Sequence, residues 1–164
     1  MRAPPRFVAD AMLGSIARKL RIFGFDTLYF KDGDDADLEA IGRSEGRVIL
    51  TSDKLLVVHS LRRGGRAILV EGSSDRARLL SILAQAGPEA ASFSGRRESR
   101  CALCNGELEV LKRSVAAKEK IPPKVLVRHR LFFRCTSCSK LYWRGGHWDR
   151  IRRLSSSLTT KPLT

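Results

Sequence analysis

Four short apolar stretches, each followed by a stretch with helical spacing, constrain the fold of this chain of 164 residues more than any other feature. The third stretch, residues 47–51, has consecutive apolar side chains without polar alternation, which is typical of a strand buried on both faces. Strands that alternate with helices favour a parallel sheet with right-handed crossovers. We therefore expect an α/β domain over residues 1–90. Its strands should cover residues 7–9, 27–30, 47–51 and 67–70, and its helices residues 12–23, 35–44, 54–63 and 74–86.

Aspartates stand close to the ends of three of these strands. Asp10 ends the first strand, Asp35 opens the helix after the second, and Asp53 ends the third. The carboxyl ends of parallel strands lie at one edge of a sheet, where open α/β sheets usually carry their sites, so we expect the three carboxylates to converge. The simpler alternative is that each aspartate only caps the helix that follows it, because Asp is a favoured N-cap residue.

Converging carboxylates are typical of a metal site. They repel one another unless cations neutralise them, and hard oxygen ligands suit Mg²⁺ or Mn²⁺. Ions held in this way next to a phosphate activate water for hydrolysis. We therefore predict that Asp10, Asp35 and Asp53 are catalytic and bind one or two Mg²⁺ or Mn²⁺ ions. Residues 32–37 form an acidic run, and the sequence does not determine which of Asp34, Asp35 and Asp37 faces the site. Asp37 is a candidate further ligand. Alternatively, the acids around Asp35 belong to a solvated loop.

Other sites that handle phosphate or nucleotides fit the sequence less well. It contains neither a G-x-G-x-x-G motif nor a Walker lysine motif, which disfavours a nucleotide-binding fold. An aspartyl nucleophile of the haloacid dehalogenase type would require a second acid two residues after Asp10, where Met12 stands. No triad is evident for a serine or cysteine nucleophile. His59 is expected to be a surface or packing residue.

The net charge of +14 is unevenly distributed. Residues 1–99 contain 16 Lys and Arg against 13 Asp and Glu, whereas residues 100–164 contain 15 against 4. A concentrated positive charge favours binding to a polyanion, most simply a nucleic acid, because neutralised phosphates release counterions. The alternative is a solvated basic surface that only aids solubility. An anionic membrane fits less well, since the sequence has neither a long apolar segment nor a basic amphipathic anchor helix.

The C-terminal part contains two C-x₂-C pairs with 30 residues between them. The N-terminus has too few apolar residues for a signal peptide, so we expect the reducing cytoplasm, where cysteines bind metal more often than they form disulfides. Four thiolates in two pairs can close a tetrahedron around a structural zinc ion and leave no open position for a catalytic one. We therefore predict a linker over residues 91–99, a zinc ribbon over residues 100–153 and a disordered C-terminus over residues 154–164. The predicted zinc ligands are Cys101, Cys104, Cys135 and Cys138.

Basic and aromatic side chains are interleaved in residues 141–148 of the predicted ribbon. Aromatic rings stack on unpaired bases while Arg and Lys bind phosphates, which is typical of contacts with RNA. Alternatively, Trp143 and Trp148 cover the small core of the ribbon. The candidate RNA contacts are Arg128, Arg130, Arg144, His147 and Trp148 in the ribbon, and Arg18, Lys19 and Arg21 beside the predicted acidic cluster.

Taken together, these motifs resemble the PIN-like ribonuclease family that occurs at the C-terminus of Mut-seven type exonucleases and as stand-alone proteins. The resemblance implies a PIN-like α/β sandwich fused to a zinc ribbon, and metal-dependent cleavage of RNA by an acidic cluster that matches Asp10, Asp35 and Asp53. PIN nucleases often carry a fourth acid shortly after the third, whereas residues 54–58 contain none. The resemblance rests on residues 7–14, 17–21, 24–27, 35–38, 50–53, 121–123 and 142–148, together with the two cysteine pairs.

The sequence thus predicts a metal-dependent ribonuclease, most simply an endonuclease, that cleaves RNA phosphodiesters with a metal-activated water. The alternative is a non-catalytic factor in RNA or ribosome processing, which would bind RNA with a PIN-like scaffold and a zinc ribbon. The missing fourth acid and the basic C-terminal part favour this alternative. Only the first function requires that RNA is cut.

Overall fold

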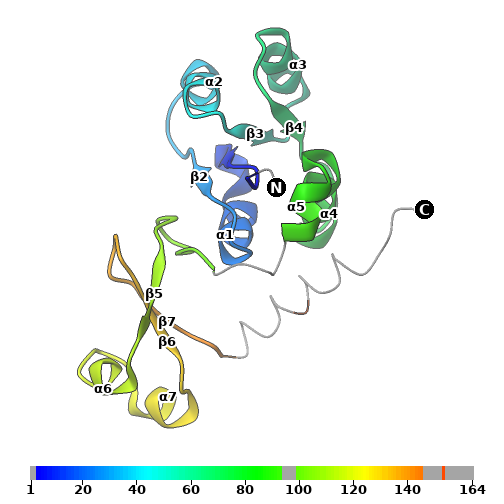
Figure 1. Ribbon diagram of the computed structural model, residues 1–164. Helices are drawn as coiled ribbons and strands as arrows, with labels where there is room; N and C mark the ends of the chain where they lie inside the picture. Colours follow the sequence, from blue (N-terminus) through cyan, green and yellow to red (C-terminus); the bar gives the residue numbers. More distant parts are fainter. Residues whose placement is uncertain (1–2, 94–98, 146–152, 154–164) are drawn as a thin grey trace.

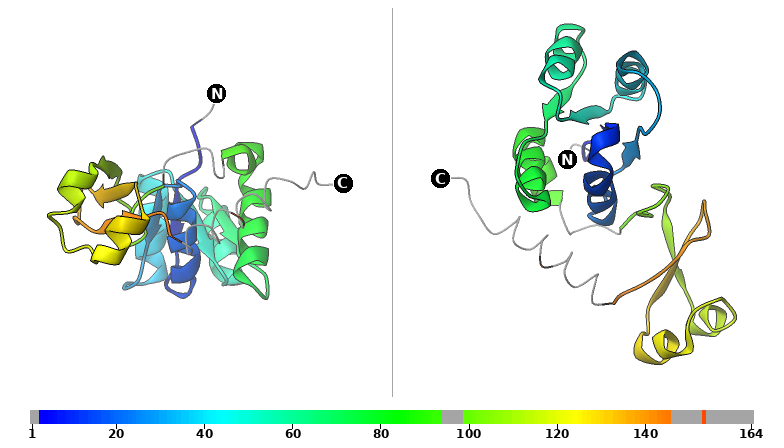
Figure 2. Two further views of the ribbon diagram at one scale, coloured as in Figure 1. Left: turned by 90° about the horizontal axis from the view of Figure 1, so that it is seen from below. Right: turned by 180° about the vertical axis from the view of Figure 1, so that it is seen from behind.

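The computed structural model describes residues 3–93, 99–145 and 153, and these residues form two sheets (Figure 1). One is a four-stranded parallel sheet with the strand order β2-β1-β3-β4, and the other is a three-stranded antiparallel sheet with the order β5-β6-β7. Helices cover both faces of the parallel sheet, and the antiparallel sheet forms a separate unit to one side of it (Figure 2). The predicted fold class, a parallel α/β sheet followed by a small unit with four cysteines, is confirmed.

The parallel sheet is built from short strands whose consecutive residues pair one to one. Phe7 pairs with Thr27 of β2 and with Val48 of β3, and Ile49 pairs with Ala67 of β4. All four strands therefore end at one edge, which we name the carboxyl edge, and begin at the opposite amino edge. The strands are β1 (Phe7–Ala9), β2 (Thr27–Tyr29), β3 (Val48–Thr51) and β4 (Ala67–Leu69).

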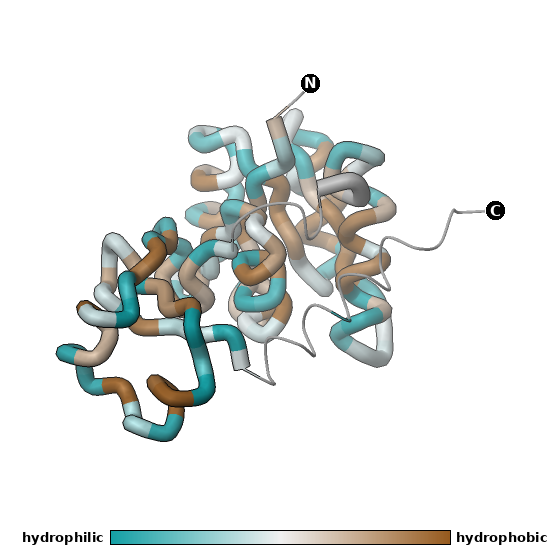
Figure 3. The backbone as a smooth tube through the Cα atoms, turned by 60° about the horizontal axis from the view of Figure 1, so that its bottom comes forward, coloured by the Kyte–Doolittle hydropathy of each residue, from teal (hydrophilic) through white to brown (hydrophobic). Residues whose placement is uncertain are grey.

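Helices pack on both faces of this sheet (Figure 1). Phe7, Ala9 and Leu50 belong to the core on the side of α1 and α4, whereas Val8 and Ile49 belong to the core on the side of α2 and α3. Burial on both faces explains why these strands lack polar alternation, and Figure 3 shows the hydrophobic segments gathered inside the domain. The helices are α1 (Gly14–Ile22), α2 (Asp35–Ser44), α3 (Lys54–Arg62) and α4 (Asp75–Ala86). None of the helices in the described residues is both long and apolar enough to cross a membrane.

Within residues 3–93, two short helices were not predicted from the sequence. A 3₁₀ helix, η1 (Ala11–Leu13), takes up the start of the predicted first helix. Helix α5 (Pro88–Phe93) includes residues 91–93, which we predicted as part of the linker. Gly87, with φ of 97°, turns the chain after α4, and Pro88 then supplies the fixed φ that suits a first helical residue.

The C-terminal unit is a three-stranded antiparallel ribbon with two short helices. Leu111, Ala116, Ile121 and Phe132 form its small core. Pro123 is the first residue of the second of these helices, where its fixed φ suits the first turn. The elements are β5 (Leu108–Leu111), α6 (Arg113–Ala116), α7 (Pro123–Arg128), β6 (Phe132–Cys135) and β7 (Leu141–Trp143).

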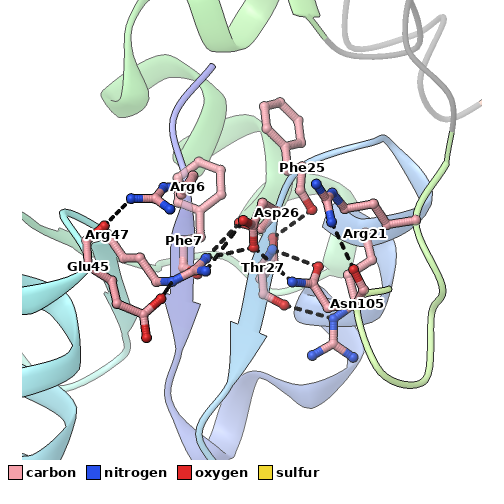
Figure 4. A network of polar contacts seen from close by, with 10 residues as sticks. Arg6, Phe7, Arg21, Phe25, Asp26, Thr27, Glu45, Arg47 and Asn105 are labelled. Carbon is pink, nitrogen blue, oxygen red and sulfur yellow. Dashed lines mark hydrogen bonds and ion pairs between the residues drawn. The ribbon is translucent and has the colours of Figure 1, made fainter. Parts of the chain in front are cut away.

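Asn105 joins the ribbon to the amino edge of the parallel sheet (Figure 4). Its Oδ1 accepts a hydrogen bond from the buried Thr27 N–H (2.9 Å), and its Nδ2 donates to Asp26 Oδ1 (2.7 Å). Asp26 also pairs with Arg47 (2.7 Å). Burial alone would raise the pKa of Asp26, but the hydrogen bonds from Arg47 and Asn105 outweigh it and lower the pKa. A charged carboxylate therefore stands at the contact between the two units.

Arg21 forms a second link between the two units. Its Nε donates to Thr27 O (2.8 Å), and its Nη1 donates to the carbonyl oxygens of Ala102 (3.0 Å) and Leu103 (2.9 Å). The Arg21 residue is only 5% exposed. We predicted Arg21 as an RNA contact, and this buried placement does not fit that role.

Replacing Asn105 with glycine is expected to lower the free energy of unfolding by about 1 to 3 kcal/mol. The change leaves the buried Thr27 N–H without its acceptor, and glycine retains the left-handed backbone of this position, where φ is 70°. Ser139 is the matched control, because it follows the second cysteine pair and has φ of 59°. Urea unfolding of the zinc-loaded variants checks this, and equal stability of Asn105→Gly and Ser139→Gly would contradict it.

Several predictions fall on parts of the chain that the structure does not describe. The predicted RNA contacts His147 and Trp148 lie outside the described residues. So do residues 94–98 of the predicted linker and residues 154–164, which we predicted to be disordered.

Candidate active site and metal centre

The carboxyl edge of the parallel sheet brings Asp10 and Asp53 together around Thr51. Strands β1 and β3 are neighbours, and the Asp10 N–H extends their pairing by donating to Leu50 O (3.0 Å). The hydroxyl of the buried Thr51 donates to Asp10 Oδ2 (2.8 Å) and accepts from the Asp53 N–H (3.1 Å). One side chain thus connects the loops that carry two of the predicted catalytic aspartates.

Both aspartates also cap helices, as in the simpler alternative. Asp10 Oδ1 accepts from the Ala11 N–H (2.6 Å) at the start of η1. Asp53 Oδ1 accepts from the N–H groups of Leu55 (2.7 Å) and Leu56 (3.3 Å) at the start of α3. Each carboxylate oxygen has two lone pairs, and Asp53 Oδ2 receives no hydrogen bond from the described residues. Capping a helix and binding a metal ion are therefore compatible here.

Asp35 and Asp53 line one open groove of about 540 Å³ between α2 and α3. Asp35 is the first residue of α2 and is exposed. Asp34 instead caps this helix by accepting from the Asp37 N–H (2.9 Å). Neither Asp34 nor Asp37 lines the groove, and Asp10 does not line it either. Among the three neighbouring acids, the structure therefore favours Asp35 as the one that faces Asp53.

The three predicted ligands do not form one compact cluster. Within residues 3–93, 99–145 and 153, only the four cysteines form a group of three or more potential ligands that lie close enough together to bind one ion. The Asp53 backbone is linked to the Asp10 carboxylate through the Thr51 hydroxyl, and Asp53 shares the lining of the groove with Asp35. A shared Mg²⁺ or Mn²⁺ site stays a prediction.

Asp75 is a further carboxylate that follows a strand of the parallel sheet, and we did not predict it. It is the first residue of α4, which follows β4, and it accepts hydrogen bonds from Lys19 Nζ (2.5 Å) and from the Ser15 hydroxyl (3.2 Å) of α1. The bond from Lys19 holds the pKa of Asp75 below its usual range. Its position after a strand is the signal that could have revealed it. Lys19, a predicted RNA contact, is thus already paired with an acid.

The four cysteines lie together as their spacing predicted. Their Sγ atoms all lie within 4.8 Å of one another, with 3.6 Å between Cys101 and Cys138 and 3.4 Å between Cys104 and Cys135. Four sulfurs at about 2.3 Å from a tetrahedral zinc ion stand about 3.8 Å apart. A disulfide bond would need only about 2.05 Å between two sulfurs. The cluster therefore fits a structural zinc ion.

Tyr142 supports this metal centre from β7. Its hydroxyl lies 3.0 Å from Cys101 Sγ, and burial together with this sulfur raises the pKa of Tyr142, so the phenol stays protonated and donates. Burial alone would raise the pKa of the Cys101 thiol, but hydrogen bonds from Tyr142 and from backbone N–H groups lower it to about 6. The Tyr142 hydroxyl thus stabilises the thiolate form of Cys101, which is the form that binds zinc.

A comparison with protein families matches almost the whole chain. The family model described as Mut7-C RNAse domain covers residues 5–155. The chain belongs to the Mut7-C RNAse domain family. The match includes the α/β unit and the ribbon, and it confirms the resemblance seen in the sequence. Among curated proteins and among solved structures, no match was found.

The predicted RNA contacts in the ribbon of this Mut7-C chain that the structure describes are all exposed. Arg128 ends α7, and Arg130 follows it before β6. Arg144 follows β7, and its guanidinium lies 5.7 Å from the centroid of the Phe133 ring, within the range of a cation–π contact. Arg18 of α1 is exposed as well.

Glu39 and His59 form a contact in the groove that the sequence did not predict. Glu39, on α2, is only 2% exposed, and its Oε1 accepts from the Ser60 hydroxyl (2.9 Å) and lies 2.8 Å from His59 Nδ1. Its Oε2 lies 3.4 Å from Arg63 Nη1. His59 is exposed, as expected, but it also lines the groove. No local spacing relates α2 to α3, so this contact had no signal in the sequence.

Proposed function

We propose that this Mut7-C chain is a metal-dependent ribonuclease whose active site lies at the carboxyl edge of the parallel sheet. Asp10, Asp35 and Asp53 would bind one or two Mg²⁺ or Mn²⁺ ions there. The observation that carries the proposal is the placement of Asp10 and Asp53 just after two neighbouring parallel strands, where the Thr51 hydroxyl joins them. Membership of an RNAse domain family supports it.

The residues at this edge suit hard divalent cations, because they offer carboxylate oxygens. Bound beside a phosphodiester, such an ion would supply an activated water and offset the charge of the phosphate. Thr51 holds the Asp10 carboxylate by donating to Oδ2, and it fixes the start of α3 by accepting from the Asp53 N–H. The N-termini of α2 and α3 would add positive partial charge near the phosphate.

We further propose that the four cysteines hold a structural zinc ion and that the ribbon helps to bind RNA. The exposed Arg128, Arg130 and Arg144, together with the basic composition of the C-terminal part, support this role. Asn105 attaches the ribbon at the amino edge, opposite to the acids. An RNA that contacts both must therefore run along the α/β domain.

The zinc-loaded chain is expected to convert a closed circular RNA to a linear product in Mn²⁺ or Mg²⁺, and to leave it intact when neither ion is added. A circular RNA has no ends, so its linearisation requires an endonuclease. Gel electrophoresis of the circular RNA and of a linear RNA with the same sequence provides the measurement. Shortening of the linear RNA alone would indicate an exonuclease, and two intact RNAs would contradict the proposed activity.

A second function, non-catalytic binding of RNA, is favoured by the separation of the three carboxylates and by the basic C-terminal part. In that case the chain would bind RNA with a steep dependence on salt, since phosphate contacts release counterions. Such binding, together with intact circular and linear RNA in every divalent ion, would establish this second function in place of the first.

A further inference from the structure

The groove between α2 and α3 changes its charge along its length. Asp35 and Asp53 stand at the starts of the two helices, His59 lies further along α3, and Arg62 and Arg63 stand at its end. An α-helix rises about 1.5 Å per residue, so His59 lies about 9 Å and Arg62 about 13.5 Å beyond Asp53 along the helix axis. The basic residues therefore stand toward the opposite end of the groove from the two carboxylates.

Positive charge is in excess at this end of the groove. Arg43 and Arg63 share one carboxylate, with Glu39 Oε2 lying 3.8 Å from Arg43 and 3.4 Å from Arg63. Arg62 lines the groove and makes no ion pair with the described residues. Glu39 therefore offsets only part of the positive charge, and the remainder can attract an anion.

Glu39 also determines which nitrogen of His59 is available. Burial alone would raise the pKa of Glu39, but hydrogen bonds from His59 and Ser60 outweigh it and lower the pKa, so the carboxylate is charged at neutral pH. A charged carboxylate only accepts hydrogen bonds, and the His59 Nδ1 at 2.8 Å must therefore carry the hydrogen. The other nitrogen, Nε2, accepts a hydrogen bond in the neutral ring and donates one only in the charged ring.

We propose that His59, Arg62 and Arg63 form a second phosphate-binding subsite, which binds the RNA backbone at a phosphate beyond the one held at the carboxyl edge. This inference rests on the proposed function for its substrate, although binding at the subsite does not itself require cleavage. Because only the charged imidazole donates from Nε2, the subsite binds phosphate more tightly as the pH falls. The charged and titratable groups that line the groove with His59 are Asp35 and Glu39 of α2, and Asp53, Arg62 and Arg63 of the α3 segment. Arg43 of α2 also pairs with Glu39 (3.8 Å).

Binding of a fluorescent single-stranded RNA to the zinc-loaded chain, without added Mg²⁺ or Mn²⁺, tests the subsite. Arg62→Ala is expected to weaken binding by roughly three- to tenfold. It should also reduce the slope of log Kd against log salt by about 0.7, the share of one phosphate of a single strand. The matched control is Arg66→Ala, since Arg66 is exposed but precedes β4 and does not line the groove. Equal affinity of the two variants would overturn the proposal.

The pH dependence of the same binding tests the role of His59. Affinity of the wild type should fall as the pH rises, because the neutral ring no longer donates from Nε2, and His59→Gln should remove most of that fall. Glu39 acts as a positioning residue, so Glu39→Ala should flatten the profile as His59→Gln does. Glu39→Gln, whose amide oxygen can still accept from His59, should preserve it in part. Identical pH profiles for the wild type and His59→Gln would overturn this role.

The binding experiment separates the subsite from the proposed function. If Arg62→Ala weakens binding while circular RNA stays intact in every metal ion, the subsite stands and the ribonuclease activity fails. If RNA is cut while Arg62→Ala binds as tightly as Arg66→Ala, the activity stands and the subsite fails. A wild type that binds no RNA overturns the subsite.

Discussion

The Asp53→Asn variant is expected to cleave RNA in Mn²⁺ about 100-fold or more slowly than the wild type, with nearly unchanged stability. Asparagine caps helices about as well as aspartate, and Asp53 caps α3 through Oδ1 alone. Asparagine lacks the negative charge with which a carboxylate attracts a divalent cation, so it should bind the ion more weakly. Single-turnover cleavage of circular RNA and urea unfolding, measured on the same preparations, check the two parts of this expectation.

Asp34→Asn is the matched control for this prediction. Asp34 caps α2 by accepting from the Asp37 N–H (2.9 Å), yet it does not line the groove, so its replacement should leave cleavage unchanged. Asp10→Asn would be harder to interpret, because both Asp10 oxygens accept hydrogen bonds, from Ala11 and from Thr51. Cleavage by Asp53→Asn at the rate of the wild type would contradict a ligand role. A loss of cleavage that accompanies unfolding would assign Asp53 to capping alone.

Removal of zinc is expected to unfold the ribbon and to leave the parallel sheet folded. The buried core of the ribbon consists of Leu111, Ala116, Ile121 and Phe132, which is small for a unit that folds without a metal. Binding of structural zinc in comparable small sites contributes on the order of 10 kcal/mol. Amide NMR signals of β5, β6 and β7 should therefore lose their dispersion in the zinc-free protein, whereas signals of β1 and β3 should retain it.

Two variants distinguish loss of the metal from a change in the surrounding turn. Cys135→Ser removes a buried predicted ligand and should reproduce the zinc-free spectrum. Ser137→Ala lies in the same turn, provides no predicted ligand and should leave zinc content and spectrum unchanged. Dispersed ribbon signals in the zinc-free wild type would show that the cysteine cluster does not hold the ribbon together.

Much of the α/β domain could be predicted because its signals are local. Helix α2 spans Asp35–Ser44 as predicted, since periodic apolar residues and turn residues at both ends are readable along the chain. The position of Asp10 and Asp53 at one edge could also be predicted, because parallel strands share their direction. Which of the acids around Asp35 faces the groove depended on the rotation of α2, which the sequence alone leaves open.

The contacts that the sequence did not reveal all join distant residues. Arg21 was predicted as an RNA contact, but it binds the carbonyl oxygens of Ala102 and Leu103, which are 81 and 82 positions away along the chain. The guanidinium group has five N–H donors, which suits it to several carbonyls at once. The contact between Glu39 and His59 joins two helices and likewise has no local pattern. Such pairs become visible only when the packing of the elements is known.

Calorimetric titration of Mn²⁺ into the zinc-loaded wild type and into Asp53→Asn tests the central claim, that carboxylates at the carboxyl edge hold the ion used in cleavage. Prior loading of the cysteines with zinc leaves the carboxylates as the predicted Mn²⁺ ligands. The wild type should bind one or two Mn²⁺ ions with an affinity that matches the Mn²⁺ dependence of cleavage, and Asp53→Asn should lose this binding. Equal number and affinity of Mn²⁺ ions in the two proteins would contradict the claim.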